Sequence, residues 1–213
     1  MTDAITALLE LAIFLYGLSR WESLDRARRL LTAWAGGWVV ASAVNLLLAR
    51  SPGYVHVAFQ LFLPLGTLLA LGTLAAMQHS RRERDALRIA GALYALIWAV
   101  VTLTLEDLGD YSTVTGPLHH LLITGAAAYT LQSALRRIQG EVLDDSTAVV
   151  SIGFLAWAAP TALIHPMIPV LEGEPMLQVL LTARNLVAIF GYLVLIRALR
   201  LPRISRRRQE ACA

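Results

Sequence analysis

Seven long apolar stretches follow one another along this chain, and short loops separate them. A run of about 18 or more apolar residues is long enough to cross the hydrocarbon core of a bilayer as a helix. Because backbone polar groups find no water there, such segments must satisfy their own hydrogen bonds as helices. The sequence predicts an all-α, polytopic membrane protein with a seven-transmembrane-helix bundle. The stretches cover residues 4–19, 30–49, 56–77, 88–106, 117–135, 148–170 and 176–199.

The composition agrees with a membrane protein of one domain. Hydrophobic residues make up 57% of the 213 residues and charged residues only 15%, whereas soluble domains carry about a quarter charged residues. The stretches use nearly the whole chain, so we expect a single transmembrane domain over residues 1–200 and a short arginine-rich tail over residues 201–213. Because no extramembrane domain is expected, any signal from the protein must pass through a partner, or its function must lie in chemistry inside the bundle.

The basic residues are all arginines, and their placement predicts the orientation. Sixteen of the 18 lie on one side: 14 in the first, third and fifth loops and after the last stretch, and Arg88 and Arg197 at the adjoining ends of their stretches. Arg50 lies in an even-numbered loop and Arg184 deep inside the last stretch. Because cytoplasmic loops are enriched in Lys and Arg, the N-terminus is predicted outside and the C-terminus in the cytoplasm. Anionic head groups account for arginines beside helix ends. We therefore expect the lipid bilayer of a bacterial plasma (inner) membrane as a partner, and no nucleic acid.

Most of the ionisable and amide side chains inside the apolar stretches fall in the predicted outer half, and the inner half offers only weakly polar residues such as Gln132. Ionisable and amide side chains are costly in a bilayer and commonly mark functional sites. Together with one aromatic side chain, they predict a polar pocket open to the outside, closed by an apolar inner half. The predicted ligand-binding residues are Glu10, Asn45, Gln60, His120, Trp157, His165, Arg184 and Asn185.

Two of these residues, Glu10 and Arg184, are predicted to form a buried ion pair. Both lie at similar depth, counted at 1.5 Å per helical residue. Small residues such as Gly191 share the helical face of Arg184, which indicates a face that a neighbouring helix approaches closely. Because a buried ion pair is often no more stabilising than an apolar substitute, the pair can equally have a purely structural role.

The prolines in the stretches predict a bent helix, and the tryptophans predict side chains at the membrane interface. Prolines bend helices and free carbonyl groups, and three of them surround His165, which predicts a bent helix beside the pocket. These prolines are Pro160, Pro166 and Pro169. Trp34 and Trp38 fall toward the inner end of their stretch, as in an aromatic belt at the membrane interface.

The candidate metal or haem ligands are histidines, with Glu10 as a further candidate for a metal. His119, His120 and His165 lie at comparable depth, but a catalytic zinc needs three or more protein ligands and the chain has neither an HExxH nor an HxxxH pair. Two histidines suffice as axial ligands of haem b or as hydrogen-bond partners of a quinone. No catalytic residue is predicted, and enzymatic activity is not favoured.

Seven helices with an external N-terminus resemble the opsins in architecture alone, since no opsin motif is present. Opsins hold retinal through a Schiff base on a lysine of the last helix. This chain has no lysine, and the guanidinium of Arg184 does not form that linkage. A covalently bound retinal is therefore excluded.

The leading functional hypothesis is a sensor or ligand-binding membrane protein. Its pocket would bind a small, anionic molecule through Arg184, and movement of the bent helix would reach a separate protein partner at the cytoplasmic arginine-rich loops. The alternative is a haem- or quinone-handling subunit, or a purely structural subunit, of a larger membrane complex. A transporter is disfavoured because no ionisable residue continues the polar path into the inner half.

Overall fold

The computed structural model describes residues 2–48, 57–106, 108, 112–138 and 141–201, and all secondary-structure elements among them are helices. The predicted all-α class is thereby confirmed. The seven long helices are α1 (Thr2–Ser19), α2 (Arg26–Leu48), α3 (Val57–Met77), α4 (Arg81–Thr104), α5 (Thr115–Leu135), α6 (Ser146–Ile164) and α7 (Pro175–Arg200). Three 3₁₀ turns join some of them: η1 (Trp21–Ser23), η2 (Val142–Asp144) and η3 (His165–Met167).

The helix limits match the apolar stretches closely, with two informative exceptions. α4 begins at Arg81, well before its apolar part, because the charged segment that precedes it is rich in good helix formers. α6 ends at Ile164 instead of continuing to residue 170. Pro166 has no backbone N–H to donate to the carbonyl oxygen four residues earlier, so the α-helix ends and the chain continues as η3.

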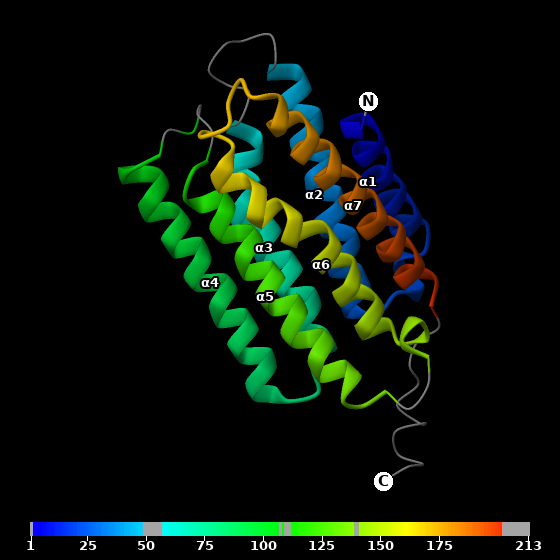
Figure 1. Cartoon of the computed structure of the whole chain (residues 1–213). Coiled ribbons are helices and arrows are strands. Elements are labelled where there is room, and N and C mark those ends of the chain that lie inside the picture. Colours follow the sequence, from blue (N-terminus) through cyan, green and yellow to red (C-terminus); the bar gives the residue numbers. More distant parts are fainter. Residues whose placement is uncertain (1, 49–56, 107, 109–111, 139–140, 202–213) are drawn as a thin grey trace, which may run out of the picture.

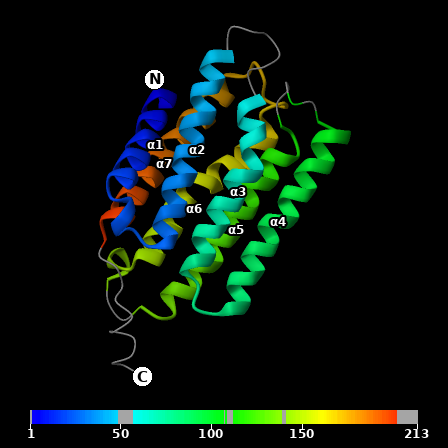
Figure 2. The ribbon, with the colours of Figure 1, turned by 180° about the vertical axis from the view of Figure 1, so that it is seen from behind.

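The helices run alternately up and down and form two layers (Figures 1 and 2). One layer holds α1, α2, α3 and α4, and the other holds α5, α6 and α7. α1 packs against both α2 and α7 and so closes one edge of the bundle, while α4 borders the opposite edge beside α3. α3 also contacts α5 and α6 across the layers.

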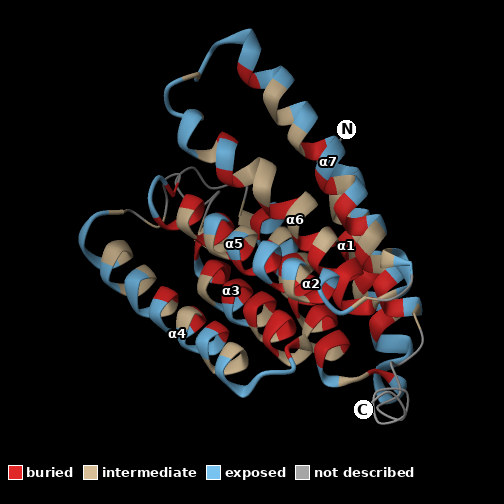
Figure 3. Cartoon of the chain, turned by 60° about the horizontal axis from the view of Figure 1, so that its bottom comes forward, coloured by how far each residue is buried: buried red, intermediate tan, exposed pale blue. Residues whose placement is uncertain are grey.

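Five helices are long and apolar enough to cross a membrane: α2, α3, α4, α6 together with η3, and α7. The apolar part of α1 is shorter, and α5, which carries two adjacent histidines, is not among the five. Buried residues line the inside of the bundle in Figure 3, whereas large side chains such as Leu46, Leu103 and Val179 are exposed on its outside. These are features of a multi-pass membrane protein.

α6 and α7 approach each other closely at a pair of glycines. A Cβ atom on Gly191 would lie 2.8 Å from the carbonyl oxygen of Gly153 and 3.0 Å from the backbone nitrogen of Trp157. Small residues at such crossings let two backbones come together, which is how helices commonly associate in membranes. The contact fixes the position of Trp157 relative to α7.

Candidate functional site

Aromatic rings fill the centre of the bundle between α2 and α6. The centroid of the fully buried Trp34 ring lies 4.9 Å from that of Trp157 and 5.2 Å from that of Phe154, and both pairs meet almost at right angles. Trp38, one turn further along α2, lies 5.8 Å from Trp157. Edge-to-face pairs of this kind stabilise a core beyond the area that they bury. The rings form one wall of the candidate site.

The expected position of Trp34 and Trp38 in an interfacial belt is wrong, because both side chains are buried inside the bundle. The spacing of the two tryptophans along the helix predicts that they are buried, whereas their depth in the bilayer does not. Trp34, Trp38, Ala41 and Asn45 follow one face of a helix, and all four are buried in the structure. A face with that spacing is directed toward neighbouring helices, whatever its depth.

Three histidines meet beside this wall, at the end of the bundle where α5 begins and α6 ends. The ring centroids of His119 and His120 are 4.7 Å apart, and His165 lies 5.3 Å from His120. Trp157 lies 5.0 Å from His120 and 5.9 Å from His119. We call these four residues the histidine cluster. The structure thus brings together His120, Trp157 and His165, which the sequence assigns to one pocket.

The hydrogen bonds of the fully buried His119 indicate which ring nitrogen carries the proton. The Thr67 hydroxyl donates to the carbonyl oxygen of Leu63 at 2.8 Å. Because that hydroxyl has only one proton, His119 Nδ1, 2.5 Å from Thr67 Oγ1, is assigned as the donor between them. The lone pair then lies on His119 Nε2, which is buried without a hydrogen-bond partner among the described residues. Thr67 is absent from the predicted site because the sequence does not reveal this contact between helices.

The other two histidines lie against the first turn of α5. His120 Nδ1 donates to the carbonyl oxygen of Gly116 at 2.9 Å, so His120 Nε2 also carries a lone pair. A Cβ atom on Gly116 would lie only 2.8 Å from His165 Cε1. A side chain at Gly116 would therefore displace His165 from the cluster.

A carboxylate from the preceding loop holds the start of α5. Glu106 Oε1 accepts from the backbone N–H of Val114 at 2.6 Å and of Thr115 at 3.3 Å, and Oε2 accepts from the Thr115 hydroxyl at 2.6 Å. An anion at a helix N-terminus satisfies N–H groups that have no partner within the helix. Burial raises the pKa of Glu106, but these hydrogen bonds and one from Ser112 outweigh burial and hold that pKa below its ordinary value.

We expect Glu106→Gln to lower the melting temperature at pH 7 and to lose this effect in acid. The pKa of Glu106 is lower in the folded than in the unfolded state. The carboxylate therefore stabilises the fold above its unfolded pKa of about 4.3, and the stabilisation disappears as the pH falls through the folded pKa. Melting curves between pH 7 and pH 3 measure the difference from the parent. Glu172→Gln, an exposed acid in the loop before α7, is the control, and an equal response from it would contradict the assignment.

The predicted ion pair between Glu10 and Arg184 is wrong. The Tyr192 hydroxyl donates to Glu10 Oε1 at 2.5 Å, and the ion pairs among the described residues do not join Glu10 to Arg184. Arg184 instead donates through Nε and Nη2 to the Asn185 side-chain oxygen, at 3.0 and 2.7 Å. Tyr192 follows Arg184 by eight residues, about 12 Å of helix. Glu10 therefore lies outside the histidine cluster.

The two remaining predicted residues, Asn45 and Gln60, are buried where α2 ends and α3 begins. The side-chain oxygen of Asn45 has no hydrogen-bond partner among the residues that the structure describes. Both lie at the same end of the bundle as the start of α5 (Figure 1).

The histidine cluster does not fit a haem as it is packed. Axial ligands of one haem lie on opposite faces of the macrocycle, whereas the His120 and His165 rings meet each other edge to face at 84° and Trp157 covers His120. Among the described residues, no group of three or more His, Cys, Asp or Glu side chains is arranged to hold a metal ion.

A comparison with protein-family models, with curated proteins and with solved structures finds no match for this chain. What the site can do follows from its own groups. His119 Nε2 is a buried hydrogen-bond acceptor, while the indole N–H groups of Trp34 and Trp38 are buried donors, and none of these atoms has a partner among the described residues. Atoms of this kind can pair with a complementary hydroxyl or carbonyl group.

Proposed function

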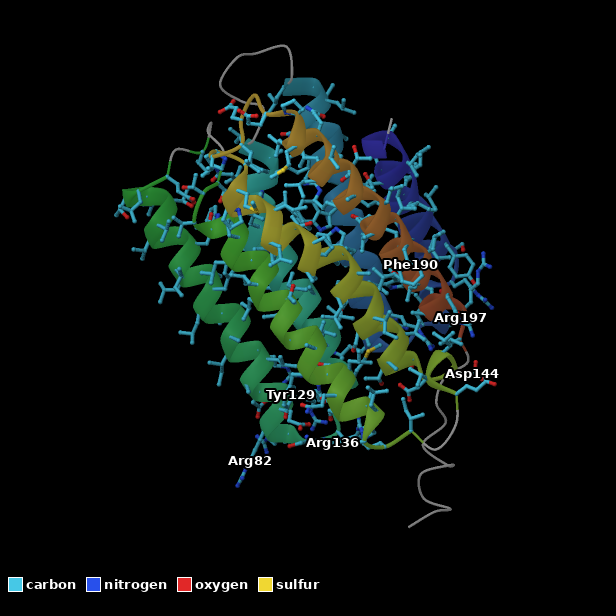
Figure 4. All side chains as sticks on the ribbon, in the orientation of Figure 1. Arg82, Tyr129, Arg136, Asp144, Phe190 and Arg197 are labelled. Atoms are coloured by element: carbon cyan, nitrogen blue, oxygen red, sulfur yellow. The ribbon has the colours of Figure 1, made fainter. Side chains whose placement is uncertain are left out.

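We propose that this protein crosses the plasma membrane seven times, with its N-terminus outside and its C-terminus in the cytoplasm. The alternating helix directions and the predicted orientation support the proposal, because they put the arginine-rich loops together at one end. Arg82, Arg136 and Arg197 lie toward that end in Figure 4. α5 has no Asp, Glu, Lys or Arg over its whole length, as expected for a membrane span, although it carries two histidines.

The single cysteine, Cys212, tests the orientation, although it lies outside the described residues. A membrane-impermeant maleimide should leave Cys212 unlabelled in intact cells and label it after permeabilisation, since the tail is proposed to be cytoplasmic. A variant with Cys212→Ser and a new cysteine near the N-terminus, Asp3→Cys, should show the opposite pattern. Labelling of Cys212 in intact cells would reverse the proposed topology.

We further propose that the protein binds a small molecule at the histidine cluster. The fully buried His119 carries this proposal, because its Nε2 has no partner within the described structure. An unsatisfied buried polar atom costs about 1–3 kcal/mol, and native proteins carry few of them. A ligand hydroxyl that donates to Nε2 removes that cost.

Arg184 directs the choice of ligand. Its guanidinium is bonded to the Asn185 side-chain oxygen on α7, and its positive charge favours a ligand with a negative or partly negative group. In this proposal a hydroxylated ring donates its hydroxyl to His119 and carries its electronegative substituent toward Arg184. In this proposal the protein is a sensor: occupancy of the cluster shifts η3 and the end of α6, and a partner docked at the arginine-rich loops registers the shift.

Quinone handling is the second candidate, and one observation favours it. The hydroxyl of a reduced quinone donates to His119 Nε2, and its carbonyl form accepts from an indole N–H such as that of Trp38 in the aromatic wall, so both states find a partner in the candidate site. The sensor and quinone hypotheses therefore differ in the identity of the ligand and agree on where it binds.

Organic extraction of the purified protein, followed by mass spectrometry, tests the site. We expect a small molecule in near-equimolar amount from the parent, and at least a tenfold loss in His119→Phe, which keeps the ring and removes the acceptor. Ser151→Ala is the matched control: Ser151 is also buried, but its hydroxyl is bonded within α6 to Thr147.

The identity of the extracted compound separates the two candidates, since a quinone supports the second and another compound the first. Equal retention by His119→Phe and Ser151→Ala would contradict binding at the cluster. The absence of any bound compound in the parent, with normal melting of all three proteins, would mean that the cluster is purely structural.

A further inference from the structure

A groove lies at the opposite end of the bundle, where η1 leads from α1 into α2. Its volume is about 540 Å³, and it is lined by Trp21, Leu24, Asp25, Arg26, Arg29, Leu30 and Ala33. None of these residues belongs to the histidine cluster. The groove is therefore separate from the proposed ligand site, and its occupancy is independent of that proposal.

The charged end of the groove is positive. Arg29 is held in place, since its Nε donates to the carbonyl oxygen of Trp21 at 3.0 Å and its guanidinium lies 5.8 Å from the centre of the Trp21 ring. Arg26, one turn earlier on the same helix, is exposed. Asp25 also lines the groove, but its carboxylate is paired with the buried Arg28 at 3.2 Å. Two arginine charges thus remain to attract an anion.

The rest of the groove is apolar. Leu30 and Ala33 follow the arginines along α2, so the lining changes from charged to apolar over about 10 Å, from Arg26 to Ala33. α2 runs from this point into the apolar part of the bundle. The polarity of the groove therefore changes in the same direction as that of a phospholipid, from its head group to its acyl chains.

We propose that this groove binds the phosphate group of an anionic phospholipid, with Arg26 and Arg29 on the phosphate and the start of an acyl chain along Leu30 and Ala33. The guanidinium group suits this role because it offers several N–H donors in a plane that matches a phosphate. Trp21, 39% exposed beside the groove, has the amphipathic character of side chains at the membrane interface.

Native mass spectrometry of the detergent-purified full chain, titrated with phosphatidylglycerol or phosphatidylcholine, tests the proposal. An arginine near an anionic head group contributes about a fivefold gain in binding, so Arg26→Gln/Arg29→Gln should weaken phosphatidylglycerol binding roughly 30-fold. Arg81→Gln/Arg82→Gln removes the same charge from the exposed start of α4 and is the matched control. Phosphatidylcholine binding should be weak in all three proteins.

A second variant separates a seated lipid from general attraction to negative charge. Ala33→Phe fills the apolar end of the groove without a change of charge and should also weaken phosphatidylglycerol binding. Glycerol phosphate, titrated alone, tests a soluble phosphate as the ligand and should bind far more weakly than the lipid. Equal losses in the two double-arginine variants, unchanged binding by Ala33→Phe, or tight binding of glycerol phosphate would each overturn the lipid assignment.

Discussion

Replacing Gly191 with leucine is expected to destabilise the bundle by about 3 kcal/mol or more. A Cβ atom at this position meets backbone atoms of α6, including the carbonyl oxygen of Gly153 at 2.8 Å, and not the movable end of a side chain. Overpacking of a tight core costs about 1–3 kcal/mol even where side chains can shift. Here α6 and α7 must separate, which also moves Trp157 and Tyr192. Unfolding in mixed micelles, titrated with a denaturing detergent, measures the loss.

The chain offers a matched control on α5. A Cβ atom on Gly125 meets nothing within 4 Å, so Gly125→Leu adds the same side chain to a helix without a clash. It should be neutral or slightly stabilising, because glycine is about 1 kcal/mol less favourable than alanine inside a helix. If both variants lose stability equally, the close α6–α7 contact does not determine stability.

The positions of the helices could be predicted from the sequence because the hydrocarbon thickness and the need for internal hydrogen bonds leave one solution for long apolar runs. Two helix limits differ from the apolar runs, and each difference has a local cause that hydrophobicity does not reveal. Charged residues extend α4 toward its start, and Pro166 ends α6 early. Seven spans and their orientation remain predictions, since length and apolarity identify five membrane-crossing helices.

The candidate site could be predicted only in part, because depth along a helix does not give direction around it. Depth places His120 and His165 at one end of the bundle, where their rings meet. The partners that fix the histidines come from other helices, Thr67 from α3 and the carbonyl oxygen of Gly116 from the start of α5. Such contacts depend on how the helices rotate and tilt, and packing sets these angles.

The hydrogen bond between Glu10 and Tyr192 is another contact between helices that depth does not predict. Its removal is expected to have the second large effect on stability. The depths counted along the helices correctly predict that Glu10 faces α7. They give Arg184 as its partner because the count assumes that both helices begin at the same plane of the membrane. In the structure Glu10 lies beside Tyr192, eight residues further along α7. Both side chains are buried, and Glu10 makes no ion pair within the described structure. The Tyr192 hydroxyl is therefore the donor on which the carboxyl group depends.

Removing one partner of this hydrogen bond should cost more stability than removing both. Tyr192→Phe leaves the Glu10 carboxyl group buried without its donor, which should cost about 1–3 kcal/mol. Glu10→Leu/Tyr192→Phe replaces both groups by apolar ones and should recover most of that loss, because no polar group then stays unsatisfied. Detergent-induced unfolding of the parent, the two single variants and the double variant gives the coupling energy directly. Tyr16→Phe, at a partly exposed tyrosine of α1, should change stability by less than about 0.5 kcal/mol. If the losses of the single variants simply add in the double variant, Glu10 and Tyr192 are not coupled, and the contact between α1 and α7 depends on apolar packing alone.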